Sequence, residues 1–85
     1  MPKKVTVYST AYCPFCMRAK ELLKRKNISF EEVDLTNNQK KRDELEQKTG
    51  WMTVPMIFIG EEFIGGYDDL SALSEAGELD AKVRS

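Results

Sequence analysis

The hydrophobic residues of this chain gather in short β-prone runs that alternate with longer amphipathic stretches. Four runs predict strands, because each holds apolar residues with β propensity in a short stretch between polar or glycine residues. They occupy residues 5–9, 29–35, 56–60 and 61–66. The last run opens with a tight turn, so the final two strands are predicted to form a hairpin.

The stretch after the first strand predicts a helix that begins at Pro14. Proline suits the first helical position, where its missing N–H would have no partner. Asn27 is the expected end of this helix. Helical spacing places on one face the apolar residues Cys16, Ala19, Leu22 and Leu23.

Capping signals and apolar spacing predict three further helices. Thr36 and Gln39 predict a capping box at the start of a highly charged second helix, which Gly50 ends as a left-handed cap. Asp68 is expected to cap a third helix, which Gly77 ends. A short fourth helix is expected close to the last residue of the sequence.

The order of these elements is β-α-β-α-β-β-α with an extra helix, which predicts an α/β fold. A strand–helix–strand unit implies that the first two strands pair in parallel through a right-handed crossover. The hairpin adds an antiparallel pair. The sequence therefore predicts a four-stranded mixed sheet flanked by helices.

Composition narrows the functional classes. The 85 residues suffice for one small domain. A hydrophobic share of 41% and a charged share of 32% fit a globular chain. The net charge of −1 gives no basic field for nucleic acid or an anionic membrane. With no apolar run of membrane-span length and no signal-like apolar segment after the opening lysines, we expect a cytoplasmic protein.

Both cysteines of the chain lie in the motif CPFC, as Cys13 and Cys16. A structural zinc site needs about four ligands. With two cysteines and no histidine, the chain cannot complete such a site from thiolates and imidazoles, which argues against zinc. A structural disulfide here would close a very small loop and contribute little stability. An inert buried pair is a further alternative, since cysteine often packs as a small hydrophobe. A reactive pair is favoured because the cytoplasm is reducing and a strand–CxxC–helix pattern is typical of redox sites.

The reactive interpretation assigns different roles to the two thiols. If Pro14 is the first helical residue, Cys13 is the N-cap, and its sulfur faces unpaired N–H groups at the positive end of the helix dipole. Those donors favour a thiolate and make Cys13 the predicted nucleophile. Cys16 lies one turn later on the apolar face. It is expected to be more buried and to resolve a mixed disulfide.

Three blocks together resemble the glutaredoxin family, in its small dithiol class: CPFC at 13–16, TVP at 53–55 and GGYDD at 65–69. The resemblance implies a thioredoxin-like (glutaredoxin) fold in a single domain, residues 1–85. It implies a glutathione-dependent thiol–disulfide oxidoreductase that acts on disulfide-containing or glutathionylated proteins. Glutathione would be the electron-donating co-substrate, with no tightly bound cofactor and no metal. We expect a monomer.

The resemblance also implies a glutathione site. Pro55 is similar to the family's cis-proline, which would turn the backbone of Val54 towards a bound substrate beside Thr53. Arg42, on the second helix, lies where the family usually has a Gln, Lys or Arg for the glycine carboxylate of glutathione. The GGYDD block resembles the pocket for the γ-glutamyl end, with the residues Gly66, Tyr67, Asp68 and Asp69.

The chain departs from the family pattern around the cysteines. Thr10 stands where many relatives have a lysine, and Phe15 replaces a frequent tyrosine. Met52, preceded by Trp51, stands where arginine is frequent. The rim of the site is therefore predicted to be more apolar and less cationic than usual, which affects the choice of substrate more than the reaction.

Two alternative functions remain open at this point. One is a redoxin that receives electrons from a thioredoxin reductase, although the GGYDD block argues against it. The other is a binding module, a glutathione-ligated iron–sulfur cluster carrier, although members noted for this tend to have Gly or Ser where Pro14 stands.

Overall fold

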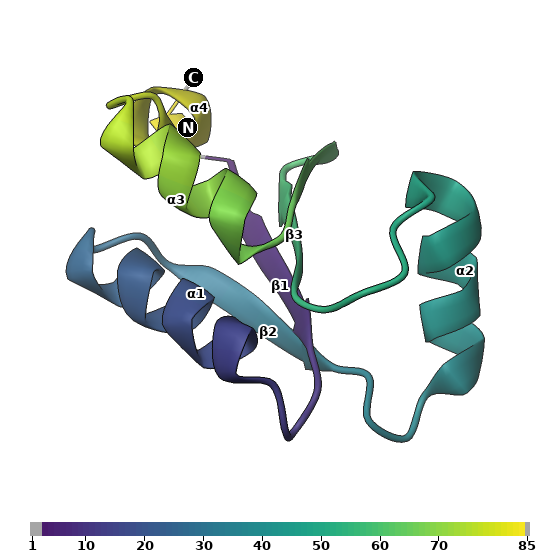
Figure 1. Ribbon diagram of the computed structural model, residues 1–85. Coiled ribbons are helices and arrows are strands. Elements are labelled where there is room, and N and C mark those ends of the chain that lie inside the picture. The colour runs from purple at the N-terminus through teal and green to yellow at the C-terminus, as the bar shows by residue number, and fades with distance from the viewer. Residues whose placement is uncertain (1–2, 85) are drawn as a thin grey trace.

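The computed structural model describes residues 3–84, which form a four-stranded sheet with helices on both faces (Figure 1). In chain order the elements are β1 (Val5–Ser9), α1 (Pro14–Arg25), β2 (Phe30–Asp34), α2 (Gln39–Thr49), β3 (Met56–Ile59), β4 (Glu62–Gly65), α3 (Tyr67–Glu75) and α4 (Leu79–Arg84). The predicted α/β order of elements is confirmed.

The strands are arranged in the order β2-β1-β3-β4. β1 pairs in parallel with β2 through the α1 crossover, and Val7 lies opposite Glu32. β3 is antiparallel to both β1 and β4. The mixed sheet and the hairpin are therefore as predicted. This topology places the chain segments after β1, before β3 and after β4 near one end of the molecule.

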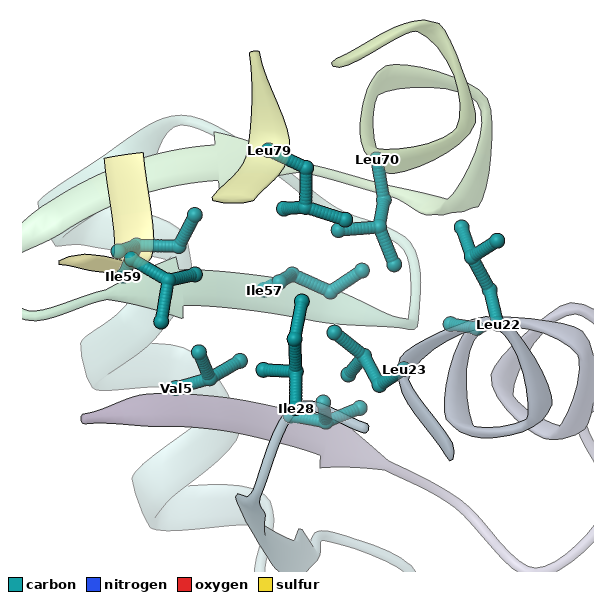
Figure 2. Packing of buried hydrophobic residues seen from close by; sticks show 11 residues of the cluster. Val5, Leu22, Leu23, Ile28, Ile57, Ile59, Leu70 and Leu79 are labelled. Atoms are coloured by element: carbon teal, nitrogen blue, oxygen red, sulfur yellow. The ribbon is translucent and has the colours of Figure 1, made fainter. Parts of the chain in front are cut away.

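The core is divided between the two faces of the sheet. The larger cluster joins the sheet to α1, α3 and α4, and Figure 2 shows its side chains meeting between these elements. Its members are Val5, Val7, Ala19, Leu22, Leu23, Ile28, Ile57, Ile59, Leu70, Leu79 and Val83. A smaller cluster on the opposite face holds α2 through its single buried residue, Leu45. Because α1 and α3 share the larger cluster, their first turns are fixed relative to each other.

The ends of α1 and α2 follow the predicted stop signals. Asn27 has a φ of 58° directly after the C-cap of α1, and Gly50 ends α2 with a φ of 75°. The second strand is shorter than predicted and ends before Leu35. The N–H of Leu35 still donates to the carbonyl of Ser9 at 2.7 Å, and its side chain is buried.

The predicted capping box of Thr36 and Gln39 is wrong. The N-cap of α2 is Asn38, whose side chain accepts a hydrogen bond from the N–H of Lys41 at 3.2 Å. Thr36 is already engaged, because its hydroxyl and its N–H both donate to the carboxylate of Asp34, at 2.6 and 2.9 Å. Short polar side chains in such a loop can each accept hydrogen bonds from the free backbone N–H groups. Asn38, which directly precedes the helix, is the residue that caps it.

The predicted cap of α3 is also wrong by two residues. Gly66 is the N-cap, and Asp68 is the second residue of the helix. Asp69, the third, accepts a hydrogen bond from the N–H of Gly66 at 3.2 Å. The carboxylate that satisfies the helix start therefore reaches back from inside the first turn.

Within residues 3–84, none of the helices combines the length and the apolar character that crossing a membrane requires.

Candidate functional site

Cys13 occupies the N-cap of α1, as predicted, and Pro14 is the first helical residue. Its sulfur accepts a hydrogen bond from the N–H of Cys16 at 3.1 Å. This N–H is one of the donors that a helix start leaves without an internal partner. A thiolate at Cys13 would keep this bond and lie at the positive end of the helix dipole.

Cys16 lies one turn later and is more buried, as predicted. Its exposed fraction is 1%, against 9% for Cys13. Burial raises the pKa of Cys16 to about 12, and the hydrogen bond with Cys13 acts in the same direction. The backbone of Thr10 and the charge of Lys20 oppose this shift. Cys16 is therefore a thiol at neutral pH, and both cysteines are free.

The TVP block lies next to Cys13. The Val54–Pro55 peptide bond is cis, as the family resemblance implied. The thiol of Cys13 lies 3.6 Å from the carbonyl oxygen of Val54 and donates to it. A thiolate would give up this bond, which would leave the Val54 carbonyl available to a hydrogen-bond donor of a bound molecule.

A pocket of about 150 Å³ opens beside the cysteines. Its wall draws on all three sequence blocks, although they are far apart in the chain. The lining residues are Phe15, Trp51, Thr53, Val54, Pro55, Gly66, Tyr67, Asp68 and Asp69. Seven of the predicted glutathione-binding residues are thus brought together around one cavity.

The first turn of α3 forms the charged end of this pocket. Its N–H groups lie at the positive end of a helix, which suits a carboxylate. The side chains of Asp68 and Asp69 are exposed and suit an ammonium group. Glycine at position 66 lets a ligand approach the backbone closely. A β-carbon there would fill this space, at 3.3 Å from Cζ2 of Trp51 and 3.6 Å from the carbonyl oxygen of Pro55. The pocket can therefore receive both charges of an amino-acid end.

Two pocket residues were not among the predicted site residues. Phe15 lies between the cysteines, and its ring centroid is 6.3 Å from that of Tyr67. Trp51 packs edge-on against Phe63 at 5.7 Å and forms the wall next to Gly66. Phe15 lies within the CPFC block and Trp51 just before the TVP block, and this was the only signal that could have identified them.

Arg42 is not among the residues that line the pocket. It is half-buried in the first turn of α2. A contact between its side chain and a bound ligand stays a prediction.

Exposed hydrophobic side chains lie next to the cysteines and the TVP block in the sequence, as the predicted apolar rim requires. The large hydrophobic side chains that are exposed within residues 3–84 are Tyr12, Phe15, Met17 and Met52. Three of them flank Cys13 or Cys16 in the sequence, and the fourth precedes Thr53. The guanidinium of Arg18 lies 5.4 Å from the ring centroid of Phe15 and adds one cation to this rim.

A hydrogen bond between two loops fixes the segment that leads to Cys13. The N–H of Ala11 donates to the hydroxyl oxygen of Thr36 at 2.9 Å. Thr36 thus joins the β1–α1 loop to the β2–α2 loop instead of capping α2.

Across residues 3–84, no group of three or more His, Cys, Asp or Glu side chains is placed to hold a metal ion.

Comparison with known proteins identifies the family. The model of the family described as Glutaredoxin matches residues 5–64. The chain belongs to the glutaredoxin family. Glutaredoxins are oxidoreductases, and so is this one. It is 52% identical to a glutaredoxin of Pseudomonas aeruginosa over 77 residues, which cover 91% of this chain and 92% of the relative. It is 47% identical to glutaredoxin 3 of Escherichia coli K12 over 80 residues, which cover 94% and 96%.

Solved glutaredoxin structures share the fold. The buckwheat glutaredoxin in complex with glutathione superposes with a TM-score of 0.89 at 30% identity, over 93% of this chain and 74% of that one. The solution structure of glutaredoxin from Brucella melitensis gives a TM-score of 0.88 at 41% identity, over 98% and 90%. The thioredoxin-like fold of this glutaredoxin is therefore established, and its four-stranded mixed sheet is the family's.

Proposed function

We propose that this glutaredoxin is a glutathione-dependent thiol–disulfide oxidoreductase that works through Cys13 and Cys16. The observation that carries the proposal is the position of the Cys13 sulfur. It accepts a hydrogen bond from the N–H of Cys16 at the start of α1. It also contacts the carbonyl oxygen of Val54 at the edge of the pocket. One thiol is thus placed both to ionise and to meet a ligand.

The first step is an attack by Cys13. Its thiolate attacks one sulfur of a substrate disulfide, a Cys13–substrate mixed disulfide forms, and the other substrate sulfur leaves as a thiolate that takes up a proton. The N–H of Cys16 and the start of α1 stabilise the attacking thiolate.

Two routes then regenerate or resolve Cys13. When the mixed disulfide holds glutathione, the thiolate of a second glutathione attacks the glutathione sulfur, which gives oxidised glutathione and frees Cys13. When it holds a protein, the thiolate of Cys16 attacks Cys13, the Cys13–Cys16 disulfide forms, and the reduced protein leaves. Two molecules of glutathione then reduce the intramolecular disulfide.

The pocket is proposed to hold glutathione during the first route. The backbone of Val54, next to Thr53 and Pro55, would pair with the peptide part of the ligand. The N–H groups of Tyr67 and Asp68 would bind the γ-glutamyl carboxylate. The carboxylates of Asp68 and Asp69 would bind its ammonium group. Support comes from the convergence of these residues on one cavity and from the glutathione complex of the buckwheat relative.

Several further assignments remain predictions. The first three are a single domain over residues 1–85, a monomeric state and a contact of Arg42 with the ligand. The others are a cytoplasmic location and the use of disulfide-containing or glutathionylated proteins as substrates. They rest on the sequence and on the family.

A coupled assay tests the proposed function. Wild-type protein is given a small glutathione mixed disulfide, glutathione, glutathione reductase and NADPH, and NADPH oxidation is followed. We expect turnover that Cys13→Ser abolishes. A parallel reaction supplies thioredoxin reductase in place of glutathione and its reductase. Reduction by that enzyme alone would overturn the proposal in favour of the redoxin alternative.

A further inference from the structure

A polar network lies on the sheet side of α1, close to Cys16. The hydroxyl of Ser9 donates to Oε2 of Glu32 at 2.9 Å, and Nζ of Lys20 donates to the same oxygen at 2.5 Å. Ser9 has an exposed fraction of 2%, and the side chain of Lys20 has one of 25%. The carboxylate of Glu32 is therefore anchored by the buried hydroxyl of Ser9, and it fixes the position of the half-buried ammonium group of Lys20.

Helix geometry makes Lys20 a neighbour of Cys16. Lys20 follows Cys16 by one helical turn, so the two side chains are neighbours on one face of α1. Long side chains in a helix lean towards its N-terminus, which here is the turn of Cys16. Glu32 lies opposite Val7 in the parallel register, and Ser9 is the last residue of β1. Residues of β1 and β2 thus hold the ammonium group of Lys20, and Ser9 directly precedes Thr10, whose backbone interacts with Cys16.

Cys16 must ionise while Cys13 is in the mixed disulfide with the substrate, and a cation near Cys16 helps most in this state. In the dithiol, burial and the neighbouring Cys13 both raise the pKa of Cys16. Once the sulfur of Cys13 is bonded to substrate it carries no proton and no charge. Burial then opposes ionisation of Cys16, and the groups that favour it are the backbone of Thr10 and the charge of Lys20. Lys20 is the cationic side chain among these influences.

We propose that Lys20, held in place by Glu32 and Ser9, promotes the resolving step by stabilising the thiolate of Cys16. This inference rests on the proposed function for the role of Cys16. In the step, the Cys16 thiol gives its proton to solvent and its thiolate attacks the sulfur of Cys13. The Cys13–Cys16 disulfide forms, and the substrate sulfur leaves as a thiolate that takes up a proton. Lys20 accepts no proton, and Glu32 acts only as a positioning residue.

The size of the effect follows from thiol chemistry. Loss of the cation raises the pKa of Cys16, so less of it is ionised at neutral pH. For one pKa unit the thiolate fraction falls about ten-fold, while the remaining thiolate becomes about three-fold more nucleophilic. The expected net loss in the resolving rate is about three-fold.

A two-phase reaction with Ellman's reagent, 5,5′-dithiobis(2-nitrobenzoate), isolates the step. The attack of Cys13 releases one thionitrobenzoate, and resolution by Cys16 releases the second. We expect Lys20→Met to leave the first phase unchanged, to slow the second about three-fold, and to shift the second phase's rate–pH profile to higher pH. An ion pair this exposed contributes little to stability, so the variant is expected to fold.

Two control variants separate charge from structure. Lys24→Met removes a charge from an exposed position one turn later in α1 and should change neither phase. Lys20→Arg keeps the charge and should retain most of the second-phase rate. A Lys20→Met protein whose second phase matches wild type, or whose two phases slow equally, would overturn the inference.

A second measurement reads Cys16 directly. In a Cys13→Ser background, alkylation of Cys16 by iodoacetamide is followed against pH with and without Lys20→Met. We expect the variant's profile at higher pH, and coincident profiles would overturn the inference. Neither measurement contains glutathione, so a failure of glutathione use would leave both results interpretable.

Discussion

The thiol of Cys13 lies 3.6 Å from the carbonyl oxygen of Val54, although 41 positions separate the two residues in the chain. The contact joins the start of α1 to the loop before β3. It depends on the antiparallel pairing of β1 with β3, which places the end of one strand beside the beginning of the other. The proposed nucleophile and the backbone proposed to bind the ligand are therefore positioned by the sheet and not by either loop alone.

The two cysteines are expected to have separable functions. Cys13→Ser should lose both removal of glutathione from a mixed disulfide and reduction of a protein disulfide, because both begin with attack by Cys13. Cys16→Ser should keep most of the first activity and lose most of the second, because only a protein-bound mixed disulfide needs an internal thiol at high effective concentration. The two assays are run side by side on both variants. A folded Cys16→Ser protein without deglutathionylation would show that the assigned roles are wrong.

The two aspartates of α3 are expected to differ in their effect on stability. Asp68→Asn should raise the KM for glutathione roughly five-fold, as for an exposed charge contact worth about 1 kcal/mol, and should cost only about 0.3 kcal/mol of stability, the loss of one exposed charge at a helix start. Asp69→Ala should raise KM and also lower the free energy of unfolding by about 1 kcal/mol, because the N–H of Gly66 loses its acceptor. Steady-state kinetics and urea unfolding provide both quantities.

Glu75→Gln is the matched control for these aspartates, since Glu75 is exposed in the last turn of the same helix. Its KM should equal that of wild type. If Asp68→Asn behaves like this control, the aspartates do not recognise the ammonium group.

Gly66→Ala should block part of the pocket. The added methyl group would occupy space at the pocket wall and lie 3.3 Å from Cζ2 of Trp51, so the indole must shift slightly to make room. We expect a KM for glutathione higher by on the order of ten-fold, as for overpacking that costs about 1.4 kcal/mol. Adding Trp51→Phe, which removes the contacting atom, should recover part of the loss. An unchanged KM in the single variant would contradict the assignment of Gly66 to the ligand site.

The buried thiol of Cys16 should make the protein less stable in alkali. Its folded pKa of about 12 lies above the ordinary value of 9.0, so the unfolded chain loses this proton first as the pH rises. Between these two values the folded state binds more protons, and the free energy of unfolding falls by at most about 1.4 kcal/mol per pH unit. Urea unfolding of wild type and Cys16→Ala at pH 7 and 10 measures the difference. Equal losses in both proteins would mean that Cys16 does not titrate as described.

Local signals were sufficient to predict the strands, the helices and the N-cap at Cys13. The proline at the first helical position and the glycine after α2 act through backbone geometry, which neighbours in the sequence determine. The parallel pairing of β1 with β2 followed from the intervening helix, since a short connection cannot join parallel strands. The difference in position and burial between the two cysteines followed from the same helix start.

Tertiary contacts decided the features that the sequence did not predict. Thr36 looked like a helix cap, but its hydroxyl is used by Asp34 and Ala11 in a loop-to-loop contact. Trp51 looked like part of the apolar rim, yet it folds inwards against Phe63 and becomes the wall of the pocket. Ala11 and Phe63 lie far from Thr36 and Trp51 in the sequence, so spacing and propensity carry no information about these contacts.

Trp51 is the single tryptophan of the chain, and it stands in the wall of the pocket. The protein therefore carries one intrinsic fluorophore at the place where a ligand is expected to bind. A ligand in the pocket would replace water near the indole, so its arrival should change the intensity or wavelength of the emission without any added dye. With Cys13→Ser, which removes the chemistry, a fluorescence titration would give the affinity of the pocket separately from turnover.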